Sequence, residues 1–251
     1  MSNAAERMTA TQWLTTPSGC YVAAREQQYF DHAVADIFGY HALQLGFEDL
    51  DLLRASRIPL RVRTGMLPQA ELRADFRELP VETNSIDLML LPHTLEFSPD
   101  PHQVVREVAR ALRPEGHVVI AGFNPLSLWG LRRSVGPRGD FPWCGRFIHL
   151  TRVKDWLALV GLEIVAGSMG CYVPPCAEQK WLDRCAFMEK AGDRWWPAAG
   201  GVYYLQAIKR VRGIRLIMPK WNERAVPKKN LAPVPERVSE EDAAAARVRI
   251  Q

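Results

Sequence analysis

The sequence lacks a long apolar run. Its longest apolar stretches lie near residues 86–92 and 156–166, well short of the roughly 18 residues that a membrane-spanning helix needs. The first residues, MSNAAERMTATQWL, also lack the apolar run of about seven residues that a secretory signal contains. We therefore expect a cytoplasmic chain without a membrane span.

Cysteine is scarce as well, with five in 251 residues, an odd number. Free thiols in a reducing compartment are the natural interpretation for a chain without an export signal. Three of the five have spacings of C-x4-C and C-x8-C, and no C-x2-C pair or nearby histidine accompanies them. Structural zinc sites use such pairs, so no metal is expected on these residues: Cys20, Cys144, Cys171, Cys176 and Cys185.

The chain carries little excess charge of one sign. The formal net charge is +4, but residues 209–230 alone carry eight Lys/Arg and one Glu, which leaves residues 1–208 near −2. A basic excess points to nucleic acid or an anionic membrane, and here that argument applies only to the C-terminal segment. The composition of 47% apolar and 24% charged residues is that of a globular protein.

Hydrophobic periodicity predicts alternating helices and strands. Asp100 and Pro101 have the pattern of an N-cap followed by proline at the first helical position, and Thr151 is the expected cap of a later helix. The predicted helices cover 19–38, 48–55, 101–112, 151–160 and 178–189, and the predicted strands cover 41–46, 58–63, 85–91, 117–123, 162–167 and 201–210.

This alternation predicts an α/β fold, a Rossmann-like and mostly parallel sheet with helices on both faces and a late antiparallel strand. We expect an N-terminal extension (1–18), one domain (19–211) with insertions or a lid at 125–150 and 170–200, and a basic, disordered tail (212–251). Ligands of such sheets bind beyond the carboxyl ends of the strands. The candidate site therefore lies on the loops that start at Gly46, Asp75, Pro92 and Asn124.

Five spaced motifs within residues 74–125 carry a family resemblance: Asp75, Leu79-Pro80, Ile86-Asp87, His93-Thr94-Leu95-Glu96 and Leu112-Arg113-Pro114-Glu115-Gly116. Together they resemble the class I S-adenosylmethionine (SAM) methyltransferases of type 11. The match is close over about fifty residues and extends in outline over 19–210. The resemblance implies a Rossmann-like fold, SAM as cofactor and transfer of its methyl group.

The resemblance also implies roles for individual residues. Asp75 takes the place of the acid that accepts a hydrogen bond from the adenine amino group, and Phe76 can stack on adenine. Pro92 is a further candidate cofactor-binding residue, and His93 borders the methyl-transfer site, where it is the candidate general base. The alternatives are a loop cap or surface salt bridge for Asp75 and a structural loop histidine for His93. Asp87 is expected to cap or pair locally, and Glu96 to be a helix-entry or surface acid.

The glycine-rich loop of this family is degenerate here. The family pattern is an acid followed by Gly-x-Gly-x-Gly, whereas this chain has Gln44, Gly46, Glu48 and Leu50 at those positions. The end of the second strand, around 61–65, also lacks the usual acid for the ribose hydroxyls. In one interpretation SAM still binds, with close approach at Gly46 and the amide oxygen of Gln44 accepting from the SAM amine. In the other, the fold survives as a scaffold with weak or no SAM binding.

Two functions follow. The first is a SAM-dependent methyltransferase acting on an unidentified small molecule, because no Asn-Pro-Pro-Tyr motif of nucleobase or glutamine enzymes is present. The alternative is a non-catalytic protein that binds RNA or a protein partner through its tail and insertion. In that insertion, residues 129–143 interleave Arg132, Arg133 and Arg138 with aromatics, which fits either a lid over the acceptor site or an RNA contact.

Overall fold

The computed structural model describes residues 8–65, 70–176 and 178–210, apart from the side chains of residues 190 and 193. The predicted tail at 212–251 lies outside the described residues. A seven-stranded sheet of order β3-β2-β1-β4-β5-β7-β6 forms the centre. Its strands are β1 (His41–Leu45), β2 (Leu60–Gly65), β3 (Leu72–Arg73), β4 (Ile86–Pro92), β5 (Leu112–Phe123), β6 (Leu162–Gly170) and β7 (Val202–Lys209).

The sheet has the predicted α/β, Rossmann-like character. Strands β3, β2, β1, β4 and β5 pair in parallel, and β7 pairs antiparallel with both β5 and β6. The late antiparallel strand expected from the sequence is therefore confirmed. It enters between β5 and β6, and so brings residues 171–201 to the same end of the sheet as the end of β5.

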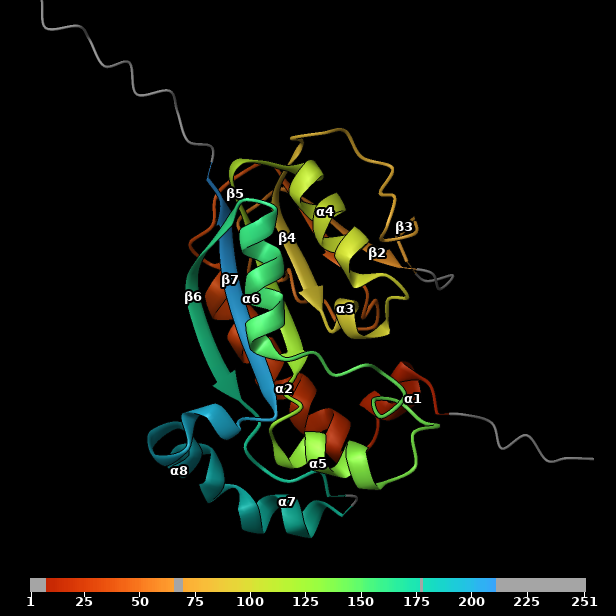
Figure 1. Ribbon diagram of the computed structural model, residues 1–251, viewed down its shortest axis with the longest axis vertical. Coiled ribbons are helices and arrows are strands. Elements are labelled where there is room, and N and C mark those ends of the chain that lie inside the picture. Colours follow the sequence, from red (N-terminus) through yellow and green to blue (C-terminus); the bar gives the residue numbers. More distant parts are fainter. Residues whose placement is uncertain (1–7, 66–69, 177, 211–251) are drawn as a thin grey trace, which may run out of the picture. The chain divides into compact units, whose positions relative to one another are not determined.

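Helices cover both faces of the sheet, with α4 and α6 in front and α2 behind in Figure 1. The helical elements are α1 (Ala10–Leu14), α2 (Pro17–Val34), α3 (Thr94–Phe97), α4 (Pro101–Ala111), α5 (Leu128–Val135), α6 (Leu150–Leu159), α7 (Gln179–Cys185), α8 (Phe187–Trp195) and a 3-10 turn, η1 (Pro197–Ala199).

Strand β4 shows why the sheet needs cover on both sides. Leu88 and Leu90 belong to the core formed with α2, whereas Met89 and Leu91 belong to the core formed with α4 and α6. All four are almost completely buried. Successive side chains of a strand point to opposite faces of the sheet. This nearly all-apolar strand therefore needs a helical layer on each face, and neither face can be exposed to solvent.

Several local expectations need correction. Residues 48–55 form turns rather than a helix, and α6 begins after His149, not after a Thr151 cap. Asp100 does cap α4, because its side chain accepts from the backbone N–H of Gln103 at 3.1 Å. The segment predicted as one helix at 178–189 is two helices, α7 and α8, that meet near Ala186.

The N-terminal residues from Met8 onward are part of the domain, not an extension. Trp13 in α1 is buried, and its ring lies 5.2 Å from that of Phe141 and 6.3 Å from that of Phe123. Thr9 caps α1 through a capping box with Gln12. A short helix of this length gains stability from packing rather than from propensity, which explains why periodicity alone did not reveal it.

Candidate functional site

A cavity of about 490 Å³ opens at the carboxyl ends of β1 and β4. This volume lies within the usual range for small-molecule sites. Five of the six predicted site residues line it, and α1 and the insertion also contribute. The lining residues are Ala10, Gly46, Phe47, Asp75, Phe76, Arg77, Pro92, His93, Thr94, Phe97, Ser98, Pro99 and Phe141, and they include the predicted Gly46, Asp75, Phe76, Pro92 and His93.

Gly46 lines the cavity in a backbone conformation that favours glycine. Its φ of 88° lies in the left-handed region that glycine adopts without strain, and its N–H donates to the carbonyl of Thr64. The nearest atoms to a side chain placed there would be those of Phe76 and Thr94, at 3.8 Å. A side chain at this position would thus be in ordinary contact with Phe76 and Thr94, and it is the positive φ that favours glycine there.

Gln44 does not lie in the cavity, which corrects its predicted role. Its side chain is fully buried, and its amide nitrogen donates to the carbonyls of Gly46, Phe47 and Leu50. Its amide oxygen accepts from the N–H of Leu52 at 3.1 Å. The hydrogen bonds that we expected Gln44 to offer to SAM instead fold the turns that follow β1.

Glu48 and Phe47 leave the loop in different directions. Phe47 faces the cavity, where its ring lies 5.7 Å from that of Phe141. The Glu48 side chain turns toward β2, and a β-carbon on Gly65 would overlap its carboxylate. The carboxylate that the sequence lacks at the end of β2 is thus present there in space, supplied from the loop after β1. Sequence reasoning missed this because it treated Glu48 only as a bulky replacement for glycine.

Asp75 lies at the cavity and forms a bidentate ion pair with Arg77. The guanidinium of Arg77 donates to both carboxylate oxygens, at 3.0 and 2.5 Å, and the Arg77 backbone N–H adds a bond of 2.9 Å. These hydrogen bonds lower the pKa of Asp75 to about 2. The alternative interpretation of Asp75, a loop salt bridge, thus describes its contacts, while its position still allows the carboxylate to face a ligand.

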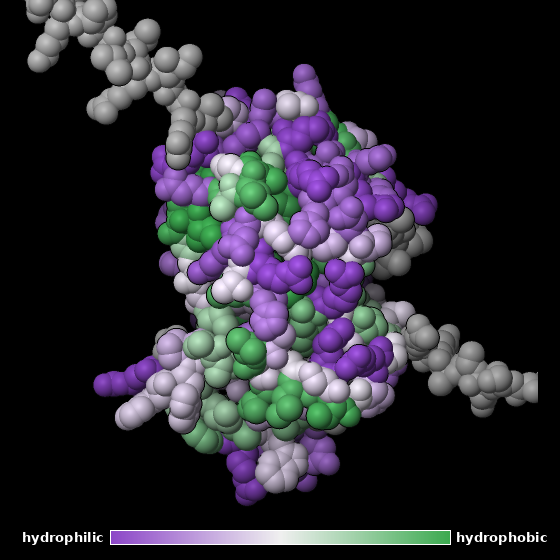
Figure 2. Space-filling model, in the orientation of Figure 1, coloured by the Kyte–Doolittle hydropathy of each residue, from purple (hydrophilic) through white to green (hydrophobic). Residues whose placement is uncertain are grey.

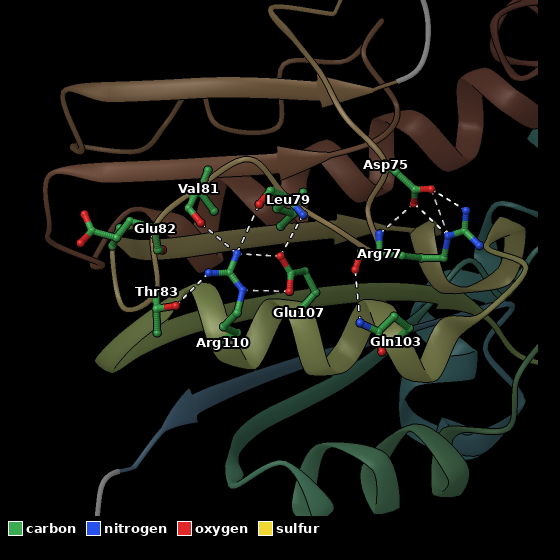
Figure 3. Close-up of polar contacts among 10 residues, drawn as sticks. Asp75, Arg77, Leu79, Val81, Glu82, Thr83, Gln103, Glu107 and Arg110 are labelled. Carbon is green, nitrogen blue, oxygen red and sulfur yellow. Dashed lines mark hydrogen bonds and ion pairs between the residues drawn. The ribbon is translucent and has the colours of Figure 1, made fainter.

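Helix α4 holds the loop that carries Asp75 (Figure 3). The Arg110 guanidinium donates to the carbonyl of Val81 at 2.9 Å and to the hydroxyl of Thr83 at 2.9 Å. Its ion-pair partner Glu107 accepts from the N–H of Leu79 at 2.8 Å. Gln103 donates to the carbonyl of Arg77. The polar face of α4 therefore replaces the hydrogen bonds that the irregular segment 77–83 cannot form with a strand.

His93 is held between two carboxylates beneath the cavity. Its Nε2 lies 2.5 Å from Oε1 of Glu26, and its Nδ1 lies 2.7 Å from Oε2 of Glu96. All three side chains are at most 1% exposed. Burial alone would lower the pKa of His93, but the two carboxylates outweigh it and raise the pKa to about 10.

The prediction of His93 as general base is at odds with this geometry. Both ring nitrogens carry protons that point at carboxylates, so neither has a lone pair for an acceptor molecule. The position instead fits the alternative of a satisfied loop histidine. Its φ of 52° places it in the left-handed region, and the two ion pairs fix that uncommon conformation.

Glu96 is not the surface acid that we expected. Its Oε1 accepts from the N–H of Phe123 at the end of β5, and burial raises its pKa. Glu26 was missed, although a signal existed. It occupies the buried stripe of α2 formed with Val22, Phe30 and Val34, and a carboxylate on an apolar stripe requires a buried partner. Asp87 caps locally as predicted, accepting from the N–H groups of Tyr40 and His41.

The insertion after β5 closes one side of the site. The side chain of Asn124 donates to the carbonyls of Ala198 and Gly200, so it forms a turn contact rather than part of the cavity lining. Arg132 lies over the ring of Trp143 at 5.3 Å, and Arg133 lies over that of Phe147 at 5.2 Å. Phe141 is the lining residue that this segment supplies.

All five cysteines are free thiols, and Cys171 is buried. Among the residues that the structure describes, no group of three or more His, Cys, Asp and Glu side chains is arranged to hold a metal ion. Across residues 8–65, 70–176 and 178–210, each helix is too short or too polar to cross a bilayer.

Comparison with known proteins relates parts of this chain to methyltransferases. A model of the methyltransferase domain family matches residues 50–120. The uncharacterized protein YafS of Escherichia coli (strain K12) is 36% identical over 137 residues, which are 53% of this chain and 56% of that protein. The ubiquinone biosynthesis O-methyltransferase of Marinobacter nauticus is 27% identical over 112 residues, 38% of this chain and 47% of that protein. The chain thus spans about half the length of these curated relatives.

Solved structures show the same fold at low sequence identity. A SAM-dependent methyltransferase from Thermotoga maritima aligns over 80% of this chain and 94% of its own, with a TM-score of 0.61 and 13% identity. A Haloferax volcanii methyltransferase complex with the activator Trm112 aligns over 82% of this chain, with a TM-score of 0.59 and 15% identity. The solved structures show that this chain has the fold of SAM-dependent methyltransferases, and the methyltransferase domain family model supports the same resemblance over residues 50–120. The cofactor that this resemblance implies is SAM.

Proposed function

We propose that this protein binds SAM in the cavity at the ends of β1 and β4 and transfers its methyl group to a small molecule. The observation that carries the proposal is the convergence of Gly46, Asp75 and Phe76 on one cavity of about 490 Å³. SAM supplies an activated methyl group on a sulfonium, so the chain's work is to bind and orient the two reactants.

The residues of the cavity fit the parts of SAM. Phe76 offers an apolar ring for adenine, and Asp75 stays ionised at neutral pH and can accept from the adenine amino group. The exposed backbone at Gly46 allows the methionine part to approach. Glu48, whose carboxylate stands beside Gly65, is the acid for the ribose hydroxyls. Gln44 does not contact SAM in this proposal. Its hydrogen bonds stabilise the turns that carry Glu48.

The aromatic wall formed by Phe47, Phe97 and Phe141 bounds the rest of the cavity. The Phe97 and Phe141 rings are stacked at 4.7 Å. Apolar walls exclude water from the reacting atoms and favour an acceptor with an apolar part. With His93 held as an imidazolium, we propose that the acceptor loses its proton to solvent or reacts in an already deprotonated form.

Isothermal titration of the full chain with SAM tests the proposal. We expect saturable binding, weakened about tenfold in Phe76→Ala, because stacking of an aromatic ring on a base is worth about 1–3 kcal/mol. Tyr40→Ala is the matched control, since Tyr40 is 68% exposed and lies before β1, at the opposite end of the sheet. Absence of binding at millimolar SAM, or equal weakening by both variants, would contradict the proposal.

RNA binding through the insertion is the second candidate, favoured by the arginines of 129–143. It has less support, because Arg132 and Arg133 lie over Trp143 and Phe147 of the same chain and are thereby less available to phosphates. Salt-dependent RNA binding that is lost in Arg132→Ala/Arg138→Ala would favour it over the small-molecule function.

A further inference from the structure

Glu26, His93 and Glu96 form a buried group that we call the carboxylate–histidine triad. Each ring nitrogen of His93 lies against a carboxylate oxygen, at 2.5 Å for Glu26 and 2.7 Å for Glu96. A nitrogen and an oxygen approach this closely when a proton lies between them. An imidazolium between two carboxylates has one negative charge in excess, and moving either proton from nitrogen to oxygen leaves that excess unchanged. The geometry therefore gives the triad a net negative charge.

This charge is not fully compensated by the surroundings of the triad. Oε2 of Glu26 is buried and accepts no hydrogen bond from the residues that the structure describes. Glu96 accepts the backbone N–H of Phe123. Arg133 attracts Glu96 electrostatically, but its guanidinium donates to the carbonyl of Gly145. A buried carboxylate oxygen without a partner costs free energy, which favours a role for this charge beyond holding the triad together.

The triad lies directly behind one wall of the cavity. His93 belongs to the cavity lining together with Pro92 and Thr94. Its ring is stacked on that of Phe123 at 4.0 Å, and it lies 5.6 Å from that of Phe47. Burial among aromatic rings keeps the local dielectric constant low, so the field of the triad reaches into the cavity with little screening.

The other charges that line the cavity cancel. Asp75 and Arg77 form an ion pair with each other, and apart from His93 the remaining lining residues are uncharged. Hydrophilic residues cover much of the surface over α4 in Figure 2, where water and salt screen their charges. The triad therefore adds an unscreened negative charge to the wall of the cavity.

We propose that the triad selects the cationic sulfonium of SAM over the neutral thioether of S-adenosylhomocysteine, the product that methyl transfer leaves. The inference rests on the proposed function, in which Gly46 and Phe76 hold the two halves of SAM on either side of its sulfur. A side chain at Gly46 would contact both Phe76 and Thr94, and Thr94 directly follows His93, so this part of the cavity adjoins the triad. A negative charge there attracts the sulfonium and leaves the thioether unaffected.

Glu26 and Glu96 lie outside the cavity lining, so they act on the ligand only through their charge and are positioning residues. A purely structural role would change the affinity for both ligands alike, because the ligands differ only in the methyl group and its charge. Comparing the two ligands on one variant therefore isolates the electrostatic contribution.

Isothermal titration of the full chain with three ligands tests this selection. The probes are SAM, S-adenosylhomocysteine and sinefungin, which carries an ammonium in place of the sulfonium. Glu26→Gln/Glu96→Gln keeps the size of both side chains, and its amides can hydrogen-bond a neutral His93 on both sides. We expect SAM and sinefungin to bind about tenfold more weakly to this variant, and S-adenosylhomocysteine to keep its affinity within about twofold.

Asp31→Asn is the matched control. It makes the equivalent change on the same helix as Glu26, but Asp31 pairs with Arg54 at the surface, where solvent screens its charge. The ratio of SAM to S-adenosylhomocysteine affinity should stay unchanged in this control. Unchanged far-UV circular dichroism shows that both variants are folded.

A second measurement needs no variant. In the wild type the affinity for SAM should exceed that for S-adenosylhomocysteine at low and at high salt alike, because salt does not screen a buried charge. A preference for SAM that disappears at high salt would assign the selection to charges at the surface and overturn the inference.

The outcomes separate this inference from the proposed function. Absence of binding of all three ligands to the wild type would contradict the proposed function and this inference with it. Binding to the wild type with an equal loss of SAM and S-adenosylhomocysteine affinity in the double variant would give the triad a structural role and overturn the inference alone. Weaker SAM binding with unchanged sinefungin binding would point to the methyl contact instead of the charge, and would overturn it as well.

Discussion

At the scale of single residues, acids decide the character of this site. Glu48 brings a carboxylate to Gly65 at the end of β2, and Glu26 and Glu96 enclose His93 below the cavity. Glu48 and Glu26 come from different elements than Gly65 and His93, whereas Glu96 lies in the turn of helix that His93 begins. Which residues become neighbours of these acids depends on how the chain folds. The roles of the three acids could therefore be assigned only from the three-dimensional structure.

Exchanging the residues at positions 48 and 65 tests whether the Glu48 carboxylate takes the place of the acid that is missing at the end of β2. Gly65→Glu alone should destabilise the protein, because its β-carbon would displace the Glu48 carboxylate and its own carboxylate would place a second negative charge beside it. Glu48→Gly alone should weaken SAM binding about tenfold, as expected for loss of a charge-assisted hydrogen bond. The double variant Glu48→Gly/Gly65→Glu should recover much of both losses. Thermal unfolding and isothermal titration measure the two effects, and failure of the double variant to recover SAM affinity would remove Glu48 from the site.

The buried His93 predicts a pH dependence of stability. Its pKa of about 10 in the folded protein lies above the ordinary 6.5, so its contribution is complete below pH 6.5 and is lost as pH rises toward 10. In this range the free energy of unfolding should fall by up to about 1.4 kcal/mol per pH unit relative to His93→Asn. Asparagine is chosen because it also tolerates a positive φ.

Urea unfolding of the wild type and His93→Asn at several pH values measures this difference. His149→Asn provides the control, since His149 is exposed before α6. A stability difference between wild type and His93→Asn that stays constant from neutral to alkaline pH would show that His93 is not held as an imidazolium.

At the scale of elements, α4 does more than cover the sheet. Its apolar side packs Val104, Val105 and Val108 into the core, while Glu107 and Arg110 hold the irregular loop that carries Asp75. The sequence predicted α4 and its Asp100 cap from local patterns, but not the contacts that Glu107 and Arg110 make with this loop. A loop of this kind needs outside partners for its backbone groups.

Arg110→Ala should therefore loosen the Asp75 loop. We expect a loss of about 1–2 kcal/mol in the free energy of unfolding, faster hydrogen exchange at the Leu79 amide and weaker SAM binding. Arg106→Ala is the matched control on the same helix, because Arg106 is exposed and bonds to Gln103. Equal exchange rates at Leu79 in both variants would show that the loop holds its conformation without Arg110.

At the scale of the whole molecule, the fold brings α1, the loops after β1 and β4 and the insertion after β5 around one cavity. A ligand there contacts several elements at once and stabilises them together. SAM at a hundred times its dissociation constant should add about 2.7 kcal/mol to the free energy of unfolding. The expected rise in Tm is about 5–11 °C, since each kcal/mol raises the Tm of a domain of this size by about 2–4 °C.

Differential scanning fluorimetry with increasing SAM measures this shift. The control is Phe76→Ala at the same SAM concentrations, which should need about ten times more SAM for an equal shift, as its weaker stacking implies. A Tm that stays constant up to millimolar SAM would contradict binding to the folded protein.

The sequence by itself determined the sheet, its helical cover and the segment from Asp75 to Gly116, because these depend on local periodicity, caps and motif spacing. Five of the six predicted site residues line the cavity for the same reason, since strand ends in a parallel sheet meet at one edge. The tertiary structure alone decided the rest. Glu48 reaches Gly65, His93 reaches Glu26 and Glu96 reaches Phe123, and the packing of α1 on Phe123 and Phe141 likewise joins residues far apart in the chain. Gln44 bonds to residues nearby in the chain, but its burial beside the turns after β1 was set by the fold. Such pairings are set by burial and by satisfaction of polar groups in the folded core, for which a single sequence holds no local signal.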